Sequence, residues 1–211
     1  TNLPAGDYTV AETIPNQNWV ATTPTSVSTN LASGQTPSYS FGNLCKGGEG
    51  GLTIGFWRNK NGQALETTND FVALTSLCLR NADGSNRDFT STLTANKSAL
   101  ASWLQGATAV NMAYMLSAQL TAMQLNVLEG SITNSAGAVY APGCGNTGPG
   151  NAYITISDLI TAANNALCAN GSTPTGHPAR ALQECLKTAL DNANNNRNLI
   201  EAAPCAFTSP Y

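Results

Sequence analysis

The sequence predicts an α+β protein in which a small, incomplete β-sandwich-like region precedes a disulfide-bonded helical domain of four to five helices. Residues 3–43 carry short runs of alternating apolar and polar residues, separated by Pro, Asn and Gly. The glycine-rich stretch CKGGEGG at 45–51 then ends this pattern. Beyond it, apolar residues recur at helical spacing. We therefore expect a β region at 1–44, a linker at 45–51 and a helical domain at 52–211.

The β region has too few strands to enclose a core. Three runs are visible, around Tyr8 and Val10, around Trp19, and at Tyr39 and Phe41. Three or four short strands make one sheet and part of a second, so a strand edge and an apolar face need a cover. We expect the cover to be another subunit, with a polymer interface at Tyr8, Val10, Tyr39 and Phe41.

The helical domain is predicted from apolar residues three and four positions apart. Ser157-Asp158 is expected to cap one helix, and residues 130–150 are expected to form a loop. Residues 206–211 are expected to be extended. The predicted helices lie at 70–79, 94–104, 111–128, about 157–168, and from Pro178 onward.

Composition narrows the possible partners. Charged residues make up 10% of the chain and the net charge is −3, so no basic patch is available for nucleic acid. No apolar run reaches the roughly 20 residues that cross a bilayer. The chain has no initiating Met and no signal peptide, which predicts a processed or truncated product. Abundant Thr, Ser and Asn with few charges suit an extracellular or cell-surface protein that packs closely against its own copies, and they suit equally an ordinary secreted domain of biased composition.

The six cysteines predict disulfides rather than a metal site. None forms a C-x-x-C pair, and His177 is the single histidine, so we expect no metal and no cofactor. An even, widely spaced set in a chain of this composition favours a disulfide framework, with 15 possible pairings for three bridges. All six follow residue 44, which predicts that their disulfides cross-link the helical domain only. The six are Cys45, Cys78, Cys144, Cys168, Cys185 and Cys205.

The stretch LPAGDYTVAET at 3–13 resembles the late strands of Cna protein B-type (prealbumin-like) domains of bacterial surface proteins and pilins. The resemblance covers about the first 43 residues and lacks the front strands. In the isopeptide-forming members, a Lys attacks an Asn while a buried Glu moves protons. By position, Glu12 matches the proton carrier and Asn43 the acceptor; the alternative is that both are ordinary positions of a relative that forms no cross-link. No Lys precedes Lys46, so a neighbouring subunit or a removed precursor would have to supply the amine.

A second stretch, GLTIGFWRNKNG at 51–62, resembles a G-F/Y-W-K/R-N-H segment of secreted bacterial proteins. In those proteins a run similar to QLTAMQLNVLEG at 119–130 follows. Lys60 replaces the usual His, which argues against a metal or acid–base role. The resemblance implies no established activity. We interpret Phe56 and Trp57 as core anchors, with a sugar-stacking platform as the alternative binding role.

Catalysis is not expected. A hydrolase needs a nucleophile with an oriented base or paired carboxylates in a cleft. His177 lies between Gly176 and Pro178, and the carboxylates Asp158, Glu184 and Asp191 are isolated in the sequence.

The leading hypothesis is a secreted structural subunit that forms an extracellular filament or surface layer. A strand from a neighbouring copy would complete the β region, and head-to-tail completion produces an open polymer. The expected donors are Ala206–Tyr211 or Thr1–Val10. The alternative is a glycan- or protein-binding module of a larger adhesin that presents Trp57 or the 130–150 loop.

Overall fold

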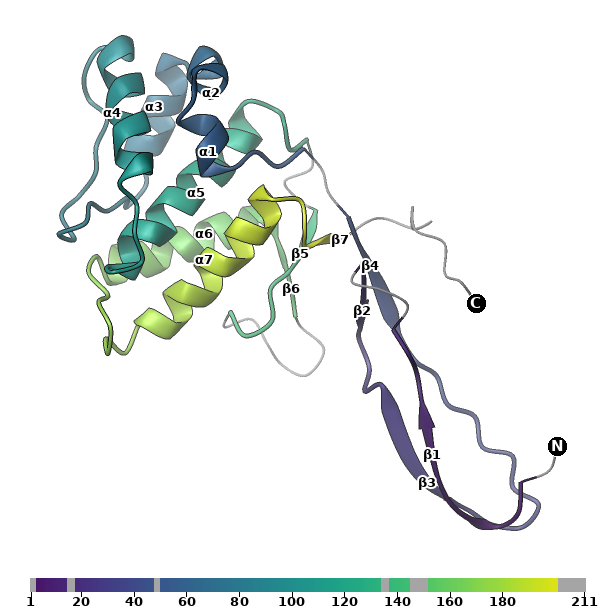
Figure 1. Ribbon diagram of the computed structural model, residues 1–211. Coiled ribbons are helices and arrows are strands. Elements are labelled where there is room, and N and C mark those ends of the chain that lie inside the picture. The colour runs from purple at the N-terminus through teal and green to yellow at the C-terminus, as the bar shows by residue number, and fades with distance from the viewer. Residues whose placement is uncertain (1–2, 15–17, 48–49, 134–136, 145–151, 201–211) are drawn as a thin grey trace. The chain divides into compact units, whose positions relative to one another are not determined.

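The computed structural model describes residues 3–14, 18–47, 50–133, 137–144 and 152–200, and these fall into two compact units (Figure 1). The β unit comprises the described residues up to Lys46, and the helical unit is Gly47–Ile200. The predicted α+β class is confirmed, with antiparallel strands, helices and two disulfides in the helical unit. The expected extended segment Ala206–Tyr211 lies outside the described residues.

The β unit consists of two antiparallel pairs. Strand β1, Gly6–Ala11, pairs with β3, Ser26–Leu31, and strand β2, Trp19–Ala21, pairs with β4, Asn43–Gly47. The strand expected at Tyr39 and Phe41 is therefore wrong, because β4 starts at Asn43.

The predicted linker also needs correction at its start. Cys45 lies within β4, opposite Trp19, and is buried. Cys45 is disulfide-bonded, so the bridges are not confined to the helical unit. Cys205 lies outside the described residues.

Seven helices are present among the described residues. All five predicted helices occur, and two short ones that the periodicity missed precede them. They are α1 (Ile54–Trp57), α2 (Lys60–Leu65), α3 (Thr68–Thr75), α4 (Leu93–Gln105), α5 (Met112–Leu128), α6 (Ile156–Ala169) and α7 (Arg180–Asn194).

Side-chain caps decide where most of these helices start. A Thr or Asn side chain accepts a first-turn amide at the start of α1 to α6. Thr155 caps α6, and Asp158 lies in the first turn, which corrects the predicted Ser157-Asp158 cap. Helix α3 ends at Thr75, four residues earlier than predicted, and α7 extends into the Asn-rich tract to Asn194.

Helix α5 is the centre of the helical unit. It contacts α1, α3, α6 and α7, and Figure 1 shows it running between the α1–α4 group and the α6–α7 pair. Because neighbours surround it, polar residues such as Gln119 and Asn126 are buried along with its apolar stripe. Such residues need internal hydrogen-bond partners.

A small sheet lies beside the helices. Strand β5, Ala138–Tyr140, pairs antiparallel with β6, Tyr153–Thr155, and with β7, Leu199–Ile200. The prediction of a loop throughout 130–150 is therefore wrong at β5. Strands of two or three residues are too short to show a readable alternation.

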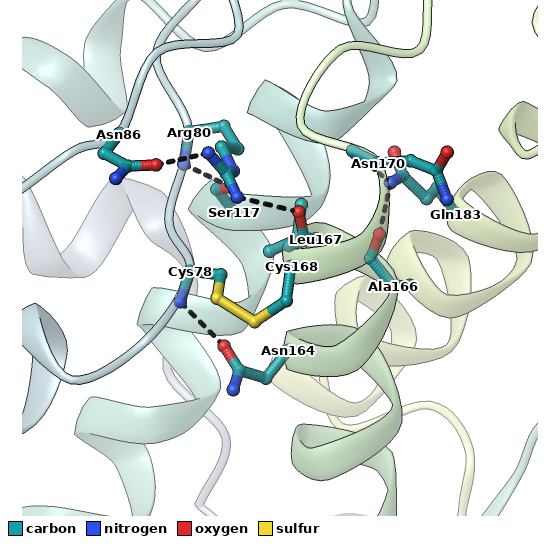
Figure 2. The surroundings of a disulfide bond; sticks show 10 residues. All are labelled: Cys78, Arg80, Asn86, Ser117, Asn164, Ala166, Leu167, Cys168, Asn170 and Gln183. Carbon is teal, nitrogen blue, oxygen red and sulfur yellow. Dashed lines mark hydrogen bonds between the residues drawn. A yellow bond between two sulfur atoms is a disulfide. The ribbon is translucent and has the colours of Figure 1, made fainter.

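Two disulfides connect parts of the helical unit that are distant in sequence. Cys78 pairs with Cys168 and Cys144 with Cys185. Figure 2 shows the first bridge, where the Cys78 amide donates to Asn164 Oδ1 at 2.8 Å. Nearby, Arg80 Nη2 donates to the Leu167 carbonyl at 3.1 Å near the end of α6. A cation at this end also interacts favourably with the helix dipole.

Candidate assembly site in the β unit

The two residues singled out by the resemblance to Cna protein B-type domains are in contact. Glu12 directly follows β1, where its amide donates to the Thr25 carbonyl at 2.8 Å, and Asn43 is the first residue of β4. Asn43 Nδ2 donates a hydrogen bond to Glu12 Oε1. The chain thus brings together side chains 31 positions apart from the ends of two strands.

This pair has unused hydrogen-bonding capacity. Glu12 Oε2 and Asn43 Oδ1 are both inaccessible to solvent and have no hydrogen-bond partner among the described residues. Both are acceptors, and leaving a buried acceptor unpaired costs about 1–3 kcal/mol. A donor that reached both oxygens would remove this cost, and an ammonium group, with three N–H donors, has the required chemistry.

One face of the β1–β3 ribbon is apolar. Tyr8 lies opposite Thr29, and Val10 opposite Val27, so these four residues alternate with the polar positions of the ribbon. Val10 is 37% exposed. On the other face, Asn30 Nδ2 donates to Asp7 Oδ1 at 2.7 Å.

The hydroxyl groups of Thr9 and Ser28 add a second polar link across this outer face, 3.2 Å apart. The hydroxyl of Tyr8 donates to the Pro4 carbonyl at 2.8 Å. The ribbon is therefore amphipathic, with a polar face of paired side chains and an apolar face with a partly open surface.

The segment before β4 has the alternation of a strand without strand pairing. No backbone hydrogen bond joins residues 36–41 to another described residue. Pairing resumes at Gly42, whose carbonyl accepts from the Thr22 amide at 2.8 Å. The predicted interface residues Tyr39 and Phe41 lie in this unpaired segment, and both are half-buried.

The other predicted binding residues lie in the helical unit. Trp57 has 0% of its surface exposed, and its indole Nε1 donates to Asn126 Oδ1 at 3.0 Å. Phe56 is half-buried and meets Trp57 edge-on, with ring centroids 5.2 Å apart. A fully buried indole has no free face for a sugar, so the platform role of Trp57 conflicts with this packing, and the core role agrees with it.

The isolated ionisable residues have local structural roles or are exposed. His177 Nδ1 accepts from the Ala179 amide at 3.2 Å, just before α7. Asp191 Oδ1 accepts from Gln119 Nε2 at 3.1 Å, and Glu184 is exposed on α7.

Among the described residues, no three His, Cys, Asp or Glu side chains are grouped so that they could bind a metal ion. In the same part of the chain, no helix combines the length and apolar character needed to span a membrane.

No family model matches this chain, and no curated protein or solved structure is significantly similar to it.

Proposed function

We propose that this protein is a secreted structural subunit that polymerises into an extracellular filament or surface layer, and that a neighbouring subunit completes its β unit. The supporting observation is the burial in the β unit. Of its described residues, Leu31 and Cys45 alone are buried. Two short strand pairs with so small an interior gain little from the hydrophobic effect, so they need a further covering surface.

The backbone supports strand addition as the form of that cover. Residues 36–41 carry strand-like alternation and unpaired backbone groups beside β4. An incoming strand would pair with these groups while its side chains covered Tyr39 and Phe41. Of the expected donors, Gly6–Ala11 is already paired with β3, which favours a donor outside this strand.

The disulfides agree with a location outside the reducing cytoplasm. Cys78–Cys168 and Cys144–Cys185 are bonds of the kind that persist in secreted proteins. Extracellular placement is thus part of the proposal.

A covalent form of the assembly would use the Glu12–Asn43 pair. A Lys amine from the neighbouring subunit would attack the Asn43 side-chain carbonyl carbon, and the amide nitrogen would leave as ammonia. The carboxylate of Glu12 would take a proton from the attacking amine and return it to the leaving group. The contact between Asn43 Nδ2 and Glu12 Oε1 supports this assignment of roles.

The size of the purified full-length chain tests the proposal. We expect light scattering and electron microscopy to show open polymers, and Phe41→Asp to reduce polymer length sharply by placing a charge in the interface. Val110→Asp is the matched control, because Val110 is 79% exposed on the helical unit. A stable monomer with an ordered β unit, or equal effects of the two substitutions, would exclude assembly through this surface.

A further inference from the structure

Three carboxyl groups lie close together in the helical unit, where α2 ends and α3 begins. Glu66 is the C-cap of α2, and Asp70 lies in the first turn of α3. Glu129 is the C-cap of α5, and its carboxyl group lies within hydrogen-bonding reach of Asp70. Three separate helix ends thus contribute one carboxyl group each to a single corner.

Of the three carboxyl groups, that of Glu66 has the surroundings least favourable to a negative charge. Its side chain is 2% exposed, and neither carboxyl oxygen has a hydrogen-bond partner among the described residues. Asp70 is also buried, but its Oδ2 accepts from the Thr67 amide at 2.6 Å and from the Thr67 hydroxyl at 2.9 Å. A buried carboxylate without a donor is costly, whereas the neutral acid is much less so.

The nearby cation does not supply the missing donor. Lys97 of α4 acts electrostatically on Glu66, yet its Nζ donates to the Gln63 carbonyl. The flanking basic residues Arg58 and Lys60 are exposed. The charged groups that act on Glu66 are therefore Lys97, which favours ionisation, and Asp70, which opposes it.

We propose that the α2–α3 corner is a proton-dependent latch, closed while Glu66 carries its proton and loosened when Glu66 ionises. The closed corner packs α3 against α4 and α5. Ionisation puts an unpaired charge inside this packing, next to Asp70, so the corner opens to hydrate it. The latch belongs to the helical unit and does not depend on whether the chain polymerises.

The raised pKa of Glu66 sets the direction in which the stability of the fold changes with pH. Burial raises the pKa of Glu66 from 4.5 to about 7, with Asp70 adding to the shift and Lys97 reducing it. The folded state then binds this proton more tightly than the unfolded state does. The contribution of Glu66 to the free energy of unfolding is therefore highest below pH 4.5, and it decreases as the pH rises toward 7.

Urea unfolding of the full chain between pH 5 and pH 8, with disulfides intact, tests the latch. We expect the wild-type midpoint to fall across this range and the midpoint of Glu66→Gln to fall much less, since burial also raises the pKa of Glu129 and leaves a smaller slope of the same sign. Glu184→Gln, an exposed carboxyl on α7, should follow the wild type. A Glu66→Gln midpoint that falls as steeply as the wild-type midpoint would overturn the proposal.

Hydrogen exchange on the wild type provides a second test that needs no variant. After correction for intrinsic rates, we expect the amides of α2 and α3 to lose protection between pH 5 and pH 8 while those of α6 and α7 keep it. Unchanged protection in α2 and α3, or an equal loss in all helices, would show that no local latch exists.

Discussion

The indole Nε1 of Trp57 donates a hydrogen bond to Oδ1 of Asn126 at 3.0 Å, inside the helical unit. Asn126 Nδ2 in turn donates to the Leu52 carbonyl and to Asn194 Oδ1, each at 2.9 Å. Asn194 Nδ2 continues the network to Gln119 Oε1 at 2.9 Å. The two segments that stand out in the sequence, 51–62 and 119–130, thus meet at one buried amide, and α7 joins them.

Asn126→Ala should lower the free energy of unfolding by about 3 kcal/mol or more, because it leaves several buried polar groups unpaired at once. Trp57 Nε1, the Leu52 backbone and Asn194 would each lose a partner. Urea denaturation followed by tryptophan fluorescence measures the loss. Thr188→Ala, exposed on α7, is the control and should change stability by less than about 0.5 kcal/mol. A loss below about 1 kcal/mol for Asn126→Ala would contradict the central role of this amide.

Gly62→Ala should destabilise the helical unit by about 1–3 kcal/mol through overpacking. A Cβ at Gly62 would lie 2.4 Å from the Phe56 carbonyl oxygen and 2.6 Å from Trp57 Cα. Gly55→Ala is a matched helical control, since its Cβ would meet Thr53 Oγ1 at 3.4 Å. Thermal unfolding should show a lower midpoint for Gly62→Ala. For Gly55→Ala, the free energy of unfolding should change by no more than about 1 kcal/mol. Equal effects would show that the close approach at Gly62 relaxes freely.

Removing either described disulfide of the helical unit should cost about 2–5 kcal/mol. The pair variant Cys78→Ala/Cys168→Ala should lose more than Cys144→Ala/Cys185→Ala, because the bridges close sequence separations of 90 and 41 residues. Longer loops lose more chain entropy when closed in the unfolded state. Chemical unfolding of both variants gives the ranking, with thiol titration to verify the remaining bridges. The reverse ranking would mean that local packing at Cys144–Cys185 outweighs loop length.

Asn43→Ala should weaken assembly more than it weakens the helical unit. The substitution removes the donor to Glu12 Oε1 and leaves both carboxylate oxygens of Glu12 without a hydrogen-bond partner among the residues that the structure describes. We expect shorter polymers with an unchanged helical signal in circular dichroism. Thr23→Ala is the control in the bend after β2, where, among the described residues, the side-chain bond lost is the one from the Gly42 amide. Wild-type polymer lengths in Asn43→Ala would remove the pair from the assembly site.

The same material tests the covalent form of the assembly. Boiling wild-type polymers in detergent and reductant should leave a ladder that Asn43→Ala lacks. Complete collapse of the wild type to 21.8 kDa monomers would exclude the cross-link and retain non-covalent strand addition.

The long helices were predictable because local sequence is enough to define them. Helix α5 follows from its apolar stripe, and its predicted start at Asn111 is the residue whose side chain caps it. The short helices α1 and α2 escaped prediction, since four and six residues are less than two turns and show no period. Their signals were the caps Thr53 and Asn59, which also occur in turns.

The candidate site was only partly accessible from sequence. Resemblance paired Glu12 with Asn43, and the two are in contact. Alternation placed a strand through Tyr39 and Phe41, but alternation reports which side chains share a face and says nothing about a hydrogen-bonding partner. The carboxyl cluster around Glu66 had no sequence signal, because its members come from three different helices.

Local periodicity and turn residues were enough to predict the α+β class, the position of the long helices and the shortage of strands in the first region. The folded arrangement was needed to show how four of the six cysteines pair, that Trp57 binds Asn126, and that the buried Glu66 carboxyl has no hydrogen-bond partner among the described residues. These relationships could not be predicted because they join residues far apart along the chain. Each exists only after packing has excluded water from both sides of the contact.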